Sequence, residues 1–225
     1  GTTASTVKVG IGTTSPDKLL TVSGSADNTM LEALQIENTD WASGETGQSV
    51  AINFKLQVAS SGLDDAGRID IGKDDSWNDA GTSDSHMAFS TNTSGTLTEY
   101  MRISSAGNVG IGTAAPNVDL EVSSATGGQI SLQRADTDVD GGDIIGQLIF
   151  RGSGGESTAT DSITGAIITA KVATGDDWEA VNEDKPTQLE FYTQDGSEAS
   201  TLGTPRMTID KAGNVGIGVT PETTF

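Results

Sequence analysis

Residues 101–116 read Met-Arg-Ile-Ser-Ser-Ala-Gly-Asn-Val-Gly-Ile-Gly-Thr-Ala-Ala-Pro, and this stretch predicts the fold of the whole chain. Apolar residues alternate with polar or small ones on either side of residues 106–108, which is the period of a β-strand. Between them, Ala-Gly-Asn supplies turn chemistry, because Gly and Asn tolerate positive φ. The stretch therefore predicts a hairpin between strands at residues 101–103 and 109–111.

The Val-Gly-Ile-Gly part of this stretch occurs three times and divides the chain into repeats. The copies begin at Val9, Val109 and Val215, and a proline follows each of them. The sequence between the copies also aligns, so the match is not a chance feature of a Gly-rich chain. We therefore predict three segments: a β module at 1–107, a second at 108–213, and at 214–225 the start of a third repeat or a C-terminal junction.

The aligned segments carry alternating apolar residues in both modules. Residues 52–55 align with 148–151, and Gly67-Arg68-Ile69 aligns with Gly165-Ala166-Ile167. Ile52 and Phe54 alternate with polar neighbours, which places them on one face of a strand. No segment combines helical spacing with helix caps. The sequence therefore predicts an all-β fold of two tandem antiparallel modules of roughly 100 residues, sandwich-like or prism-like, with six or seven short strands in each.

Glycines occupy one face of the repeated Val-Gly-Ile-Gly strand. Alternation sends Val109 and Ile111 to one side and Gly110 and Gly112 to the other, which leaves bare backbone. Glycine weakens a strand unless something approaches it closely. Two explanations fit: a bend or bulge at the module junction, or the packing of another chain against the bare side.

The composition predicts a thin core and excludes several partners. Apolar residues make up 34% of the chain, aromatic residues only 4%, and there is no cysteine to form disulfides. Small modules of this kind often need a partner chain or neighbouring repeat for stability. The formal net charge of -20 makes nucleic acid and anionic membranes poor partners. No apolar run approaches the ~18 residues of a membrane span, so we expect no membrane insertion.

Gly1 opens a segment without a signal-peptide pattern, so we expect a mature form or a fragment of something longer.

Residues 101–116, followed by Leu120-Glu-Val122, resemble the repeats of bacteriophage tail fibre and tailspike shafts, which stand upstream of C-terminal intramolecular chaperone domains. Leu189-x-Phe-x-Thr193 and Arg206-Met-x-Ile209 are further matches. Large bacterial surface proteins carry the junction motif too. The resemblance implies a homotrimeric, elongated fibre that displays a host-binding tip, located in the virion tail fibre or outside the cell.

Little in the sequence indicates catalysis. His86 is the single histidine, and no Gly-x-Ser-x-Gly elbow frames a nucleophile. We expect His86 to be a solvated loop residue and the protein not to be an enzyme.

Two loops carry a tryptophan beside paired aspartates, which could hold a sugar by stacking and hydrogen bonding. The candidate carbohydrate-binding residues are Asp75 and Trp77 in the first module and Asp177 and Trp178 in the second. Their repetition also fits a shared structural loop.

Asp136, Asp138 and Asp140 begin like a calcium loop of the Asp-x-Asp-x-Asp-Gly kind. The twelfth position, where a bidentate Glu is expected, is Gln147. Calcium is the one cofactor that the sequence suggests, and an ordinary acidic turn is the alternative.

These observations favour a structural component of an extracellular or virion fibre, most simply the shaft of a phage tail fibre that supports host-receptor attachment. Its main partner is then itself, as a homotrimer or filament. Two alternatives stay open: a module that binds bacterial surface glycans directly, and a subunit of a non-viral extracellular filament or surface adhesin.

Overall fold

The computed structural model describes residues 8–24, 34–40, 44–58, 62–75, 83–136, 138–153, 162–173, 185–194 and 203–221. These residues form thirteen β-strands and no helix, which confirms the all-β class. Within these ranges nothing helical is long and apolar enough to cross a membrane.

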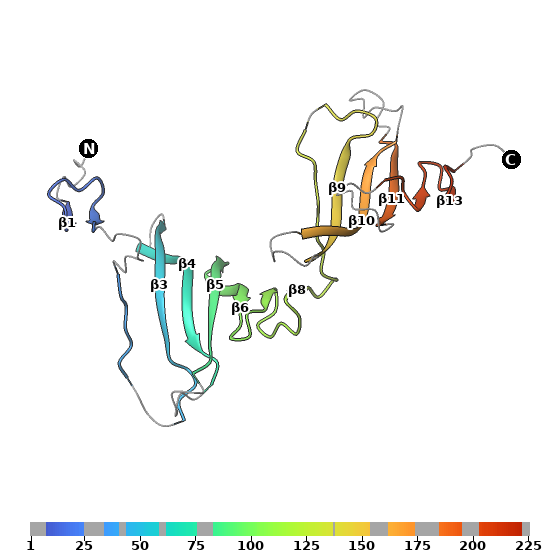
Figure 1. The fold of residues 1–225 in the computed structure, drawn as a ribbon. Coiled ribbons are helices and arrows are strands. Elements are labelled where there is room, and N and C mark those ends of the chain that lie inside the picture. Colours follow the sequence, from blue (N-terminus) through green and yellow to red (C-terminus); the bar gives the residue numbers. More distant parts are fainter. Residues whose placement is uncertain are drawn as a thin grey trace. The chain divides into compact units, whose positions relative to one another are not determined.

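The chain divides into two compact units, Gly1–Gln129 and Ile130–Phe225. The first unit contains a short parallel pair and a six-stranded sheet (Figure 1). Its strands are β1 (Val9–Ile11), β2 (Leu20–Val22), β3 (Ser49–Val58), β4 (Gly62–Lys73), β5 (Ser85–Thr93), β6 (Thr96–Ile103), β7 (Val109–Ile111) and β8 (Leu120–Val122).

The six-stranded sheet has the order β3-β4-β5-β6-β7-β8, so every strand lies beside its sequence neighbour. All pairs are antiparallel except β7 and β8, which are parallel. The predicted hairpin at residues 101–111 is present, because β6 and β7 pair across a turn in which Gly107 has φ 85°. At the turn the amide of Asn108 donates to Ser104 Oγ at 3.2 Å.

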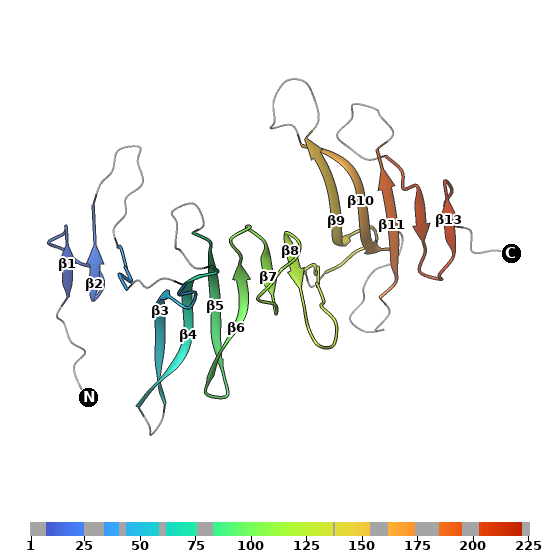
Figure 2. The ribbon, with the colours of Figure 1, turned by 90° about the horizontal axis from the view of Figure 1, so that it is seen from below.

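The described residues of the second unit form one five-stranded antiparallel sheet with the order β13-β12-β11-β10-β9 (Figure 2). The equivalent hairpin joins β12 and β13, with the carboxylate of Asp210 in place of the Ser104 hydroxyl. The strands are β9 (Ile144–Ser153), β10 (Ser162–Val172), β11 (Thr187–Thr193), β12 (Met207–Ile209) and β13 (Val215–Ile217).

Strand pairing corrects one part of the sequence alignment. Ile69 lies opposite Phe89 in the first sheet. In the second sheet the residue opposite Phe191, the counterpart of Phe89, is Ile168 and not Ile167. A one-residue error of this kind reverses which face a side chain occupies, because successive residues of a strand point to opposite sides.

The repeats and the compact units do not share a boundary. β7 and β8 belong to the second sequence repeat, which begins at residue 108, yet they hydrogen-bond onto β6 of the first. The sheet of the first unit is therefore completed by the opening residues of the next repeat. The module boundaries at 107/108 and 213/214 describe the sequence repeat and stay a prediction.

The glycines of the repeated strand are explained by the chain's own next loop. A Cβ on Gly110 would lie 2.4 Å from the carbonyl oxygen of Thr113 and 3.4 Å from the Cδ of Pro116. Gly112 has φ 74°, a conformation that favours glycine, and its Cβ would lie 2.2 Å from the carbonyl oxygen of Ser123. The loop that leads to β8 therefore lies against Gly110, and the residue that follows β8 lies against Gly112.

Replacing Gly110 with Ala should destabilise the first unit, because the added methyl group must displace backbone rather than a flexible side chain. Overpacking of this kind costs about 1–3 kcal/mol. Gly152→Ala is the control: Gly152 also lies in a strand, but nothing stands within 4 Å of its would-be Cβ. Denaturant unfolding of both variants measures the difference, and equal stabilities would contradict the close approach.

Candidate functional site

Apolar side chains from all six strands of the first large sheet share one face. Residues directly opposite each other in paired strands lie on the same face. The register aligns two rows across the sheet. The first apolar face consists of Val50, Ile71, Met87, Ile103, Val109 and Leu120 in one row and Ile52, Ile69, Phe89, Met101, Ile111 and Val122 in the other.

Five of the twelve side chains on this face are more than a third exposed in the single chain, and the other seven are partly buried. Ile52 is 44% exposed, Ile111 43% and Leu120 53%, and Phe54, next along β3 on the same side, is 53% exposed. The buried residues of the described sheet lie instead on the opposite face, among them Asp70, Ala88 and Ser90. The burial is the reverse of that expected for a sheet with its own core.

The second sheet repeats this arrangement. Its pairing register places one row through Leu148, Ile168, Phe191, Met207 and Ile217 and another through Ala170, Leu189, Ile209 and Val215; together they form the second apolar face. Leu148 is 51% exposed, and Phe150 beyond it on β9 is 55% exposed. At the end of β10, Val172 is fully buried where it hydrogen-bonds to the loop at residues 142–143.

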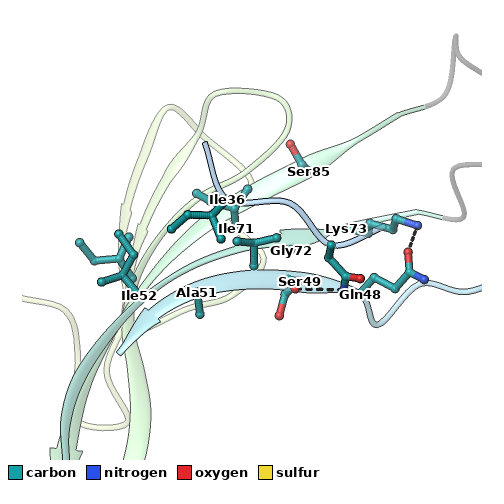
Figure 3. Close-up of a pocket in the computed structure, with 12 residues that line it drawn as sticks. Ile36, Gln48, Ser49, Ala51, Ile52, Ile71, Gly72, Lys73 and Ser85 are labelled. Carbon is teal, nitrogen blue, oxygen red and sulfur yellow. Dashed lines mark hydrogen bonds between the residues drawn. The ribbon is translucent and has the colours of Figure 1, made fainter. Parts of the chain in front are cut away.

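A pocket of about 420 Å³ lies at the β3 end of the first apolar face, beneath the segment at residues 34–40. Figure 3 shows Ile36 of this segment beside Ile71, with Ile52 further along the pocket wall. The segment is held by hydrogen bonds from Asn38 Nδ2 to the Ser49 carbonyl at 3.4 Å and from Gln48 Nε2 to the Asp40 carbonyl at 2.7 Å. The pocket is thus an apolar hollow with polar groups at one end.

The opposite face of the first sheet carries a network of charged groups. Arg102 binds Glu99 through two hydrogen bonds of 2.8 Å, and its Nη1 lies 3.3 Å from Asp74 Oδ1. The hydrogen bonds from Arg102 hold the pKa of Glu99 below its ordinary value, against the smaller opposing effect of burial.

His86 belongs to this network, and the expectation of a solvated loop residue is wrong. It lies in β5, its side chain is 11% exposed, and its Nδ1 is 2.6 Å from Asp74 Oδ1. The ring covers Gly72 on the neighbouring strand, where a Cβ would lie 2.7 Å from it. Gly72 has no side chain, and this leaves room for the imidazole ring of His86 on the neighbouring strand. The glycine, together with its cross-strand pairing with His86, is the sequence feature that could have located the ring.

The second sheet has a buried carboxylate on its polar face, at the position that corresponds to Ala88 of the first sheet. Glu190 is 3% exposed and accepts hydrogen bonds from the Tyr192 hydroxyl and, at 2.6 Å, from Gln188 Nε2. Lys171 Nζ lies 2.8 Å from Glu190 Oε1. Burial, together with the neighbouring carboxylate, raises the pKa of Tyr192. Sequence alternation predicts Glu190 on the polar side but not its burial.

Of the predicted carbohydrate-binding residues, only Asp75 lies in the described part of the chain, in the bend after β4. Trp77, Asp177 and Trp178 lie outside the described residues. The glycan site therefore stays a prediction.

The predicted calcium residues Asp136, Asp138 and Asp140 are all described, and they lie in a turn organised by Arg134. One guanidinium nitrogen of Arg134 is 3.0 Å from Asp136 Oδ2 and 3.0 Å from Asp143 Oδ2. The amide of Asp140 donates to the same Asp143 oxygen at 3.1 Å. Among the described residues, no three His, Cys, Asp or Glu side chains are grouped so that they could hold a metal ion. Calcium binding here stays a prediction.

No protein-family model matches the chain, and no curated protein matches it. Among solved structures, the carboxy-terminal domain of the bacteriophage T5 L-shaped tail fibre is similar at 13% identity and a TM-score of 0.30, over 90% of this chain and 92% of that one. The same domain with its intramolecular chaperone domain gives the same identity and score, with 64% of that chain covered. Similarity at this level carries no functional information, so function must be inferred from the chain's own surfaces.

The pKa of Glu99 predicts a pH-dependent contribution to stability. Folding lowers the pKa of Glu99, so its ionised carboxylate stabilises the folded state at any pH above the pKa that the group has in the unfolded chain, about 4.3. This stabilisation is lost as the pH falls through the lower pKa of the folded state. Glu99→Gln should cost about 0.5–1 kcal/mol at pH 7, and the difference from the parent should vanish in acid. Unfolding measured from pH 7 to pH 2.5 checks this.

The matched control is Glu99→Gln in an Arg102→Gln background, where little further loss is expected because the partner is already gone. A cost that is the same at every pH would contradict the assignment.

Proposed function

We propose that this protein is a structural component of a fibre, the shaft of a phage tail fibre, in which three copies associate through their first and second apolar faces. The observation that carries the proposal is the pair of apolar rows that crosses each sheet and is left partly exposed. The stoichiometry of three comes from the resemblance of residues 101–116 to tail-fibre repeats. The role is mechanical: the shaft holds a receptor-binding part away from the virion.

The exposed faces are large enough to drive association. Fully burying one large apolar side chain stabilises by about 1.5–3 kcal/mol, so covering the exposed half of one contributes about 1 kcal/mol. Five of the twelve side chains of the first apolar face are close to half exposed and the other seven less so, which gives on the order of 5 kcal/mol per copy. The cost of association is estimated at about 4–15 kcal/mol, so both apolar faces of each chain must contribute.

The polar faces suit the outside of such an assembly. The ion pairs of Arg102 and Glu99 and the acidic surface of a chain with net charge -20 remain hydrated there. Charge repulsion between copies opposes association but is screened by salt, whereas apolar burial is not weakened by it. Association should therefore tighten as salt is raised.

The pocket beneath residues 34–40 provides a place for an apolar side chain of a neighbouring copy. Its walls include Ile36, Ile52 and Ile71, and it opens on the first apolar face. Apolar side chains of a neighbouring copy that fill this pocket would fix the register of one copy against the other.

The two rival functions make different demands. A glycan-binding module needs Trp77 and Trp178 to meet sugar, so mutation of these residues should abolish binding on a glycan array. A non-viral filament or adhesin built from the same repeat would form open polymers rather than closed trimers. We place both below the shaft, because each sheet carries an apolar face that is partly exposed.

A charge placed on the first apolar face should abolish the trimer. Ile52→Asp should convert a particle of three times 23.0 kDa into single chains. Asn53→Asp adds the same charge one residue further along β3, on the opposite face, and should leave the trimer intact. Multi-angle light scattering measures both masses.

A parent chain that is monomeric at all concentrations and salt levels, or a trimer that tolerates Ile52→Asp and Phe54→Asp together, would overturn the proposal.

A further inference from the structure

The repeated Val-Gly-Ile strand has different hydrogen-bond partners in its three copies. β7 is paired on both edges, antiparallel with β6 and parallel with β8. In the described part of the chain, β1 has only its parallel partner β2, and β13 has only its antiparallel partner β12. The first sheet therefore has six strands and the second five, and the missing strand is the counterpart of β8.

The paired copies show which backbone groups the missing strand would meet. On β7 the amide of Val109 donates to the Asp119 carbonyl at 2.8 Å, and the carbonyl of Ile111 accepts from the Ser123 amide at 2.8 Å. On β1 the equivalent bonds, Val9 to Leu19 and Ser23 to Ile11, measure 2.7 and 2.8 Å. Two independent copies thus bind a following strand in the same way.

The other edge of β13 matches β7 as well. Gly218 donates to the Arg206 carbonyl at 2.9 Å, as Gly112 does to the Tyr100 carbonyl at 2.9 Å. Because backbone groups alternate between the two edges of a strand, the amides and carbonyls of Val215 and Ile217 face the edge that β8 occupies on β7. Ile217 is 75% exposed, against 43% for Ile111.

The chain that leaves β13 begins the same loop. The carbonyl oxygen of Val219 stands 2.4 Å from the would-be Cβ of Gly216, the distance found for Thr13 over Gly10 and Thr113 over Gly110.

The sequence keeps the same spacing after this loop. Leu20 and Leu120, which open β2 and β8, stand four residues after Pro16 and Pro116, and Phe225 stands four residues after Pro221. The third copy therefore leads to an apolar position where the other two copies begin the paired strand.

We propose that the open edge of β13 is a docking site for a parallel strand of the Leu-x-Val type, supplied by a further repeat of this chain's own kind. The strand binds with its Leu opposite Val215 and its Val opposite Ile217, as Leu120 and Val122 stand opposite Val109 and Ile111. Its two apolar side chains extend both rows of the second apolar face. Each repeat is completed by the first residues of the next.

This edge is distinct from the apolar faces, so the inference does not depend on trimer formation.

The test is a graft within the full chain. Residues 222–225 are replaced by a copy of the segment 117–129. Pro221 is then followed by the same residues that follow Pro116 in the parent chain. Hydrogen exchange is then measured residue by residue at Val215 and Ile217, with Val109 and Ile111 of the same molecule as the internal standard. The graft should slow exchange at Val215 and Ile217 at least tenfold, to the rates of the internal standard.

Two controls make the result specific. A Gly-Ser graft of equal length should give no slowing at Val215 and Ile217, and the amide of Gly216, which faces β12, should be protected in every variant. Equal exchange rates in the native-segment and Gly-Ser grafts would overturn the proposal. So would parent-chain amides of Val215 and Ile217 already as slow as those of Val109 and Ile111, because the edge would then be occupied by something else.

Discussion

The structure depends on a hydrogen-bond register that aligns the apolar residues of successive strands. Residues in direct cross-strand pairs share a face. The pairing of Ile69 with Phe89 and of Phe89 with Met101 therefore builds a continuous apolar row, to which each strand contributes one residue. Among the described residues only the segment 34–40 lies over part of this face, at its β3 end, and Ile52 and Ile111 are 44% and 43% exposed. A surface so apolar is typical of an interface between molecules.

Much of this could be predicted from the sequence. Period-two alternation located the strands around Ile52 and Met101, and the Ala-Gly-Asn turn located the hairpin between β6 and β7. Both features depend on residues that are close together in the sequence, so a short segment is enough to predict them. The threefold motif also identified the repeated strand, whose pairing proved to cross the boundary between sequence repeats.

What the sequence did not reveal depends on contacts between strands. The alignment placed Ile167 where pairing places Ile168, because it matched Gly67 with Gly165. In the structure Gly67 pairs with Phe54 as Ala166 pairs with Phe150, and this correspondence is visible only in the strand pairing. His86 looked like a solvated residue in an acidic loop, but its environment comes from Asp74, twelve residues earlier, and from Arg102, whose Nη1 also approaches Asp74. The glycines suggested either a bend at the module junction or contact with another chain, whereas the chain's own backbone approaches them.

The parallel pairing of β7 with β8 has a consequence for how such proteins change length. Its hydrogen bonds join main-chain atoms, and each copy of the repeat carries the alternating apolar pair and the glycines that the junction requires, so one copy of the repeat can follow any other. Duplication or loss of a whole repeat then leaves every remaining junction chemically equivalent. A lineage could in this way lengthen or shorten the protein in steps of one repeat through recombination, without compensating substitutions elsewhere.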